Sequence, residues 1–200
     1  MPAVARKLAM TAEEYLALES ASAERHEFVD GEIFAMTGAS DWHNDIVFRL
    51  TAALRAHFEP HGCRVHTESV KLAIESANSY LYPDVFVTCD PRDHGDRLIK
   101  RHASVAVEVL SESTAQWDRD GKFARYRKLA SLQAYVMVDT QFRHVEVYER
   151  QATPFWRYAS FGAGETARLD VVGVAMVVDE LYVDTQVPAE AVVVRAADRT

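Results

Sequence analysis

The pattern of apolar and polar residues begins with signals for a short helix and a hairpin. Thr11 followed by Glu14 is a capping box, which predicts a helix over residues 12–22. The segment at 27–36 is typical of a β-hairpin, because Asp30-Gly31 is a favoured two-residue turn between apolar runs. The N-terminal part of the chain is therefore expected to form a helix followed by a hairpin.

Longer periodic segments follow. From Asp41 to Glu59 the apolar residues recur every four positions, which predicts an amphipathic helix lying on a sheet. Apolar runs and turn signals place the remaining elements. We expect strands at 64–75, 80–89, 104–110, 134–139 and 145–149, a charged loop at 90–102, a helix at 118–130, a hairpin built from 155–161 and 167–172, and a closing segment at 174–183.

This order of elements predicts an α/β fold, an α+β mixed sheet flanked by helices, with an N-terminal helix and hairpin and added C-terminal strands. Residues 1–184 are expected to form a single domain and residues 185–200 a C-terminal tail. The run Val192-Val193-Val194 in this tail is apolar enough to dock on a partner.

Two carboxylates interrupt the apolar strands. Glu108 lies inside 104–110, a segment that otherwise reads as a strand buried on both faces, and an ionised carboxylate there costs several kcal/mol unless it is paired. Asp84 opens the preceding apolar run. Two acids on neighbouring core strands suggest a metal site.

Hard cations such as Mg²⁺ take oxygen ligands, often one or two carboxylates completed by water and phosphate. Asp84 and Glu108 supply two ligands, and the backbone carbonyl of Val109 is a candidate third. Lys122 lies on a predicted helix after the Glu108 strand and can reach back over the strand end. We therefore predict Asp84, Glu108 and Lys122 as catalytic residues with Mg²⁺ or Mn²⁺ as cofactor.

Composition and charge limit the partners and the cellular compartment that we expect for the protein. The chain has 200 residues and a net charge of −8, which argues mildly against a surface that attracts nucleic acid everywhere. Arg119 and Arg125 belong to a local basic segment that we expect to contact the phosphate backbone. Cys63 and Cys89 are expected to be separate small buried residues in a reducing cytoplasm, and neither a secretory signal nor a membrane span is recognised.

The combined motifs resemble the Uma-type putative restriction endonuclease family of the PD-(D/E)XK nuclease superfamily, over roughly residues 11–183. The resemblance is carried, in chain order, by Phe28-Val29-Asp30-Gly31-Glu32, His43, Pro83-Asp84, Val107-Glu108-Val109-Leu110-Ser111-x-Ser113-Thr114, Asp118-x-x-x-Lys122-x-x-x-Tyr126 and Tyr135-x-x-Val138-Asp139.

The resemblance implies a restriction-endonuclease-like PD-(D/E)XK core, a metal held by Asp84 and Glu108, hydrolysis of phosphodiester bonds in nucleic acid, DNA before RNA, and a homodimer. Leu110 stands where the superfamily has its lysine, so Lys122 from the following helix takes that place. Glu27 and His43 are expected as auxiliary residues, near the metal and near a phosphate respectively.

Each residue also has a simpler interpretation. Taken alone, Lys122 is typical of a solvated helix residue, His43 of a capping or surface histidine, and Tyr126 of a core aromatic. A non-catalytic module that holds nucleic acid or protein on a nuclease fold is the main alternative function. A metal-dependent hydrolase of smaller phosphate esters is a third, but no phosphate-cradling glycine loop supports it.

Overall fold

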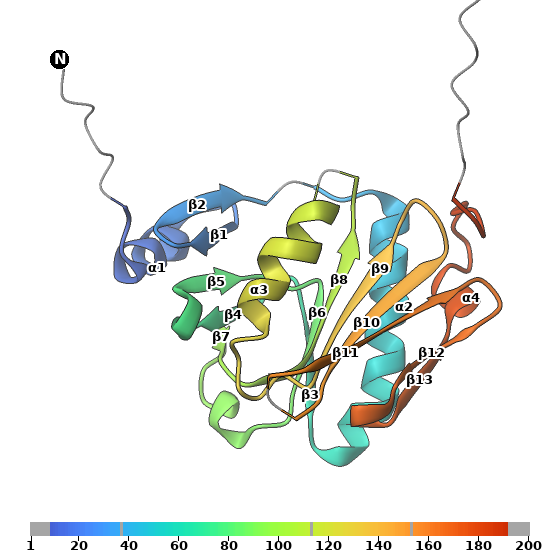
Figure 1. Ribbon diagram of the computed structural model, residues 1–200. Helices are drawn as coiled ribbons and strands as arrows, with labels where there is room; N and C mark the ends of the chain where they lie inside the picture. Colours follow the sequence, from blue (N-terminus) through green and yellow to red (C-terminus); the bar gives the residue numbers. More distant parts are fainter. Residues whose placement is uncertain (1–8, 37, 113, 153, 192–200) are drawn as a thin grey trace, which may run out of the picture.

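The computed structural model of the protein describes residues 9–36, 38–112, 114–152 and 154–191. Ser113 of the family motif and the Val192-Val193-Val194 run lie outside these residues. The strands form a six-stranded sheet in the order β11-β10-β9-β8-β6-β3, a five-stranded sheet in the order β2-β1-β5-β4-β7, and the pair β12-β13 (Figure 1). This arrangement is the mixed α+β fold that the sequence predicts.

The strands of the six-stranded sheet are β3 (Arg64–Thr67), β6 (Val85–Thr88), β8 (Ala103–Leu110), β9 (Ala134–Asp139), β10 (His144–Arg150) and β11 (Trp156–Gly162). The five-stranded sheet contains β1 (His26–Val29), β2 (Glu32–Ala35), β4 (Lys71–Ile74), β5 (Ser79–Leu81) and β7 (Ile99–Lys100). The pair consists of β12 (Thr166–Leu169) and β13 (Val174–Val177).

The α-helices are α1 (Ala12–Ala21), α2 (Asp41–Phe58), α3 (Phe123–Tyr126) and α4 (Val178–Leu181). A π-helical segment, Trp117–Lys122, leads directly into α3. Short 3-10 turns occupy Glu59–His61, Glu75–Ala77, Pro91–His94 and Asp170–Val172.

The N-terminal signals act as the sequence predicts. Thr11 and Glu14 exchange both hydrogen bonds of a capping box at the start of α1. In the β1–β2 turn both Asp30 and Gly31 have positive φ, which matches the twist of a two-residue hairpin. A Cβ atom on Gly31 would lie 2.5 Å from the Cβ of Ala9, so glycine is also required for the close approach of the segment before α1.

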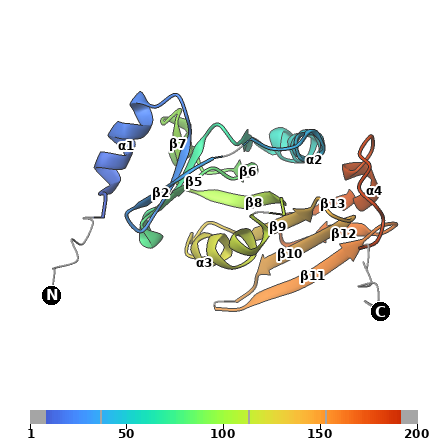
Figure 2. The same ribbon diagram turned by 90° about the horizontal axis from the view of Figure 1, so that it is seen from above.

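The two faces of the six-stranded sheet are covered by different helices. Helix α2 lies on one face, and its apolar side, including Leu50 and Leu54, packs against Val105 and Val107 of β8. Helix α3 lies on the other face, where Tyr126 packs against Ala106 and its neighbours (Figures 1 and 2). Strand β8 is therefore central and covered on both sides, as its continuous apolar run predicts.

Two predicted strands each divide into two. The segment 64–75 forms β3 and β4 with a turn between them, and 80–89 forms β5 and β6. In both cases the first and second halves belong to different sheets. At the second break, alternation does not reveal the change of sheet, because the side chains of both β5 and β6 are buried. Asp84 lies at the second break.

The C-terminal hairpin was also predicted wrongly. Strand β11 pairs with β10, and β12 pairs with β13, so 155–161 and 167–172 do not form one hairpin. The helix predicted at 118–130 is a π-helical segment followed by α3, which ends at Tyr126. Val187 is buried in the α2-side core, and its carbonyl accepts a hydrogen bond from Arg143, so the described part of the tail packs on the domain.

The cysteines differ from the expectation of separate buried residues, since a disulfide joins Cys63 and Cys89. Arg64 of β3 lies opposite Thr88 of β6, so the two cysteines are adjacent across this antiparallel pair. A reducing compartment opposes such a bond, so the cytoplasmic location stays a prediction. No helix among the described residues is long and apolar enough to cross a membrane.

Candidate functional site

Glu108 points toward α3 because of its place in β8. Val107 and Val109 pack on the α2 side of the sheet, so the alternation of a strand turns Glu108 to the opposite face. Its side chain is 2 % exposed, and its Oε1 accepts a hydrogen bond of 2.6 Å from the hydroxyl of Tyr126. The Glu108 carboxylate, whose burial carries a desolvation cost, is therefore buried as the sequence predicts.

Asp84 immediately precedes β6, which runs antiparallel to β8, and it lies at the same end of β8 as Glu108. Val85 pairs with Val107 across the antiparallel β6–β8 ladder, and continuing this register brings Asp84 beside Glu108. Asp84 Oδ2 accepts a hydrogen bond of 2.7 Å from the backbone N–H of Val109. This bond holds the Asp84 carboxylate at the end of β8.

His43 lies in the first turn of α2 and contacts Asp84. Its Nε2 atom is 3.3 Å from Asp84 Oδ2, and its ring is buried. Burial lowers the pKa of His43, but the hydrogen bond and charge of Asp84, the charge of Glu68 and a backbone hydrogen bond at Val109 together raise it above its usual range. The predicted auxiliary histidine thus joins the Asp84 side of the site.

Lys122 is surrounded by carboxylates. Its Nζ atom lies 3.1 Å from Glu108 Oε1, 3.2 Å from Asp118 Oδ1 and 3.3 Å from Glu27 Oε1. The side chain is buried, in contrast to the solvated lysine that its helix position alone suggests. The structure therefore brings together Lys122, Glu108 and the predicted auxiliary residue Glu27.

The local helix geometry explains how Lys122 reaches this position. Residues 117–122 form a π-helical segment, a form that often occurs at functional sites. Gly121 permits it, because a Cβ there would lie 2.0 Å from the ring of Trp117. Gly121, a residue type that is unfavourable inside a regular helix, is thus required by the packing of Trp117 against the backbone.

Glu27 is held by the segment that connects the two sheets. Its Oε1 atom accepts a hydrogen bond of 3.0 Å from the backbone N–H of Tyr82. The hydroxyl of Tyr82 in turn donates to buried Glu19 at 2.7 Å, which anchors this connection to α1. Glu27 and Asp84 are therefore positioned by the same stretch of chain.

Buried charge dominates the electrostatics. Burial raises the pKa of the Glu108 carboxyl well above its usual range; the Lys122 ammonium opposes this shift, and the neighbouring carboxylates add to it. Burial lowers the pKa of Lys122, but Glu108, Glu27 and Asp118 outweigh burial and raise it. Lys122 therefore stays charged, and Glu108 binds a proton more readily than an ordinary glutamate does.

Two residues outside the predicted set belong to this cluster. Tyr126 donates to Glu108, and Asp118 Oδ1 is buried without a hydrogen bond although it lies in ion-pair range of Lys122. The signal for both was the four-residue spacing of Asp118, Lys122 and Tyr126, which places them on one helical face.

The two predicted phosphate-binding arginines do not lie in this cluster. Arg119 pairs with Asp139 at 3.0 Å and with Glu146 at 2.8 Å. Arg125 pairs with Asp30 at 2.7 Å and lies over the ring of Trp117. Each guanidinium has a carboxylate partner, so a role in binding nucleic acid remains a prediction for both.

Within the described residues, no group of three or more His, Cys, Asp or Glu side chains is arranged to hold a metal ion. The carboxylates that lie near the end of β8 are instead those of Asp84 and Glu108. Oxygen ligands of this kind suit Mg²⁺ or Mn²⁺, which commonly use only one or two carboxylates.

The family model for Uma2, described as putative restriction endonuclease, matches residues 12–179. The chain belongs to this family. Membership confirms the resemblance seen in the motifs, and the family description indicates a nuclease.

Two uncharacterized proteins of Synechocystis sp. are similar to this Uma2 family member. One is 34 % identical over 173 residues, which are 86 % of this chain and 91 % of the relative. The other is 33 % identical over 172 residues, 85 % of this chain and 97 % of the relative.

A solved structure from Anabaena variabilis, described as a putative nuclease belonging to DUF820, has a TM-score of 0.72 and 16 % sequence identity. The match covers 86 % of this chain and 97 % of that one. At this identity the likeness establishes the fold, which is restriction-endonuclease-like.

Proposed function

We propose that the protein is a Mg²⁺- or Mn²⁺-dependent endonuclease that hydrolyses phosphodiester bonds in nucleic acid. The observation that carries the proposal is the charge of the buried cluster. Glu27, Glu108 and Asp118 contact one ammonium, and Asp84 lies at the same end of β8. These carboxylates outnumber the lysine, and a divalent cation would supply the missing positive charge.

The donor set fits such a cation. Asp84 and Glu108 would bind it, and the Val109 carbonyl is the proposed third protein ligand. Asp118 Oδ1 is buried, and its one polar contact is the ion pair of 3.2 Å with Lys122, so this carboxylate adds to the negative charge of the cluster. When bound, the metal would polarise a phosphoryl oxygen and lower the pKa of a water ligand.

The chain's own residues would orient the reacting groups. Lys122 would position the attacking water or stabilise negative charge on the phosphate, and Tyr126 would fix one oxygen of Glu108. Glu27 would hold Lys122 from β1, since the Tyr82 N–H fixes the Glu27 carboxylate. His43 would fix the orientation of Asp84 and face an incoming phosphate.

The direct test is calorimetric titration of Mn²⁺ into wild type, Glu108→Ala and Glu149→Ala. Glu149 is a matched control because, like Glu108, it is a buried carboxylate paired with a basic residue. Its partner is Arg157, and it lies on β10 instead of β8. We expect Mn²⁺ binding in wild type and in the control, and its loss in Glu108→Ala. Equal binding by all three proteins would refute the assignment of Glu108.

Activity is tested with Mg²⁺ or Mn²⁺ on single- and double-stranded DNA and RNA. We expect wild type to cleave at least one of these substrates, DNA before RNA, and Asp84→Asn and Lys122→Met to lose cleavage while remaining folded by circular dichroism. Sedimentation of the same samples tests the homodimer that the family resemblance implies. Failure of all four substrates with both metals would count against an endonuclease.

The second candidate is a non-catalytic binding module on the same fold. The observation that favours it is the absence, among the residues described, of a ready cluster of three metal-binding side chains. A binding module predicts salt-sensitive nucleic-acid binding that persists when both Asp84 and Glu108 are neutralised. An endonuclease predicts loss of cleavage in the same variants.

A further inference from the structure

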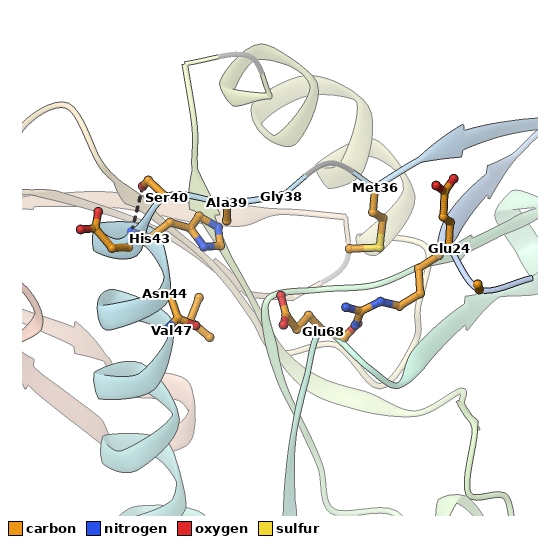
Figure 3. Close-up of a pocket in the computed structure, with 12 residues that line it drawn as sticks. Glu24, Met36, Gly38, Ala39, Ser40, His43, Asn44, Val47 and Glu68 are labelled. Carbon is orange, nitrogen blue, oxygen red and sulfur yellow. Dashed lines mark hydrogen bonds between the residues drawn. The ribbon is translucent and has the colours of Figure 1, made fainter.

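A hollow of about 540 Å³ lies beside the candidate site, between the first turns of α2, the end of the β1–β2 hairpin and the β3–β4 turn (Figure 3). Its volume is within the range of small-molecule sites. Its lining includes Arg25, Met36, His43, Asn44 and Val47, and three carboxylates, those of Glu24, Asp41 and Glu68. Figure 3 shows the His43 ring, the Met36 thioether and the Glu68 carboxylate directed toward this space.

The hollow and the candidate site share His43. This residue lines the hollow, and its Nε2 atom is 3.3 Å from Asp84 Oδ2. Glu68 also lines the hollow, and its negative charge acts on the His43 ring. A group held in the hollow would therefore lie next to a phosphate bound near Asp84.

Arg25 supplies a positive charge at the rim. Its Nη1 atom donates to the backbone carbonyl of Glu68 at 2.8 Å and to the hydroxyl of Ser69 at 3.2 Å. These partners are neutral, so they fix the guanidinium without cancelling its charge, unlike the carboxylate partners of Arg119 and Arg125. A fixed guanidinium of this kind suits a phosphate.

The interior of the hollow suits a nucleobase. Met36 and Val47 offer apolar surface, and Glu68 and Asn44 offer polar groups from two different elements. The Glu68 carboxylate accepts hydrogen bonds, so it favours bases that carry an exocyclic amino group, as cytosine does and uracil does not. The same carboxylate disfavours a second phosphate inside the hollow.

We propose that this hollow holds one unpaired nucleotide of the substrate strand, next to the bond that is cut. Arg25 contacts its phosphate, Met36 and Val47 contact its base, and Glu68 accepts a hydrogen bond from the base amino group. The inference rests on the proposed function and adds a substrate class, single-stranded nucleic acid. A stacked and paired base cannot enter such a hollow.

The test measures binding of a fluorescein-labelled, mixed-sequence DNA strand by anisotropy in EDTA, so that neither metal binding nor cleavage contributes. The strand is used alone and annealed to its complement, with wild type, Arg25→Ala and Arg97→Ala. Arg97 is the matched control, because it is an exposed arginine in the loop before β7, outside the residues that line the hollow. Circular dichroism checks the fold of each variant.

We expect wild type to bind the single strand more tightly than the duplex, and Arg25→Ala to weaken single-strand binding about tenfold more than Arg97→Ala does. Equal losses in the two variants, equal affinity for duplex and single strand, or no single-strand binding by wild type would each overturn the proposal.

Base preference provides an independent measurement. Wild type should bind oligodeoxycytidine several-fold more tightly than oligodeoxyuridine, and Glu68→Gln should lose this preference, since a glutamine amide both donates and accepts. An unchanged preference in Glu68→Gln would overturn the role of Glu68. Failure here is distinguishable from failure of the endonuclease proposal, which depends on Mn²⁺ binding and on cleavage.

Discussion

Replacing Glu108 by glutamine should stabilise the metal-free protein. Glu108 is 2 % exposed, and burial raises its pKa well above the ordinary value of 4.5. Each pKa unit by which the folded state exceeds the unfolded state costs about 1.4 kcal/mol of stability at a pH above both values. Glutamine keeps the shape and can still accept the hydrogen bond from Tyr126, but it carries no charge to desolvate.

The sign of the pH dependence follows from the same shift. Because the folded pKa of Glu108 is raised, its favourable contribution is complete below the unfolded value of about 4.5 and is lost as the pH rises through the folded value. Wild type should therefore lose stability from mildly acidic to alkaline pH, and Glu108→Gln should not show this component. Lys122 retains Glu27 and Asp118 as partners in the variant.

The assay is urea denaturation in EDTA at several pH values between about 5 and 9, where a difference of about 1–3 kcal/mol is expected at the alkaline end. Glu32→Gln serves as the control, because Glu32 is an exposed glutamate on β2 and its substitution should change stability by less than about 0.5 kcal/mol. If Glu108→Gln is instead less stable than wild type at alkaline pH, the Lys122 ion pair outweighs burial and the reasoning is wrong.

Further predictions concern the neighbours of Glu108 and the disulfide. Lys122→Met removes the ammonium shared by its carboxylate partners, so urea denaturation should show a loss of about 3–5 kcal/mol at neutral pH that shrinks on acidification, and an unchanged midpoint would contradict the burial argument. Tyr126→Phe removes the 2.6 Å hydrogen bond to Glu108 and should lower the free energy of unfolding by about 1–3 kcal/mol in the same assay. It should also weaken Mn²⁺ affinity by a larger factor than the control Tyr148→Phe, on β10, does. Gly121→Ala places a methyl group 2.0 Å from the Trp117 ring and should lower the melting temperature by a shift equivalent to about 1–3 kcal/mol; a melting curve that matches wild type would show that the π-helical segment adjusts freely. Reduction of the Cys63–Cys89 bond should cost roughly 3 kcal/mol in thermal denaturation, and mass spectrometry without reductant that finds two free thiols would refute the pairing.

The sequence determined those features whose physics is local. The capping box at Thr11 and the Asp30-Gly31 turn depend on residues a few positions apart, and both formed as predicted. The period of α2 reflects one apolar face, which is also local information. Glu108 stood out because a charge in a buried strand is unusual whatever the strand pairs with.

Tertiary structure decided what depends on pairing between distant segments. The change of sheet near Asp84, the pairing of β11 with β10 and the Cys63–Cys89 bond follow from register, which alternation along one strand does not specify. The burial of Lys122 among Glu27, Glu108 and Asp118 likewise needs three separate elements to meet. A lysine reads as solvated along the chain, and only the convergence of these carboxylates makes its burial favourable.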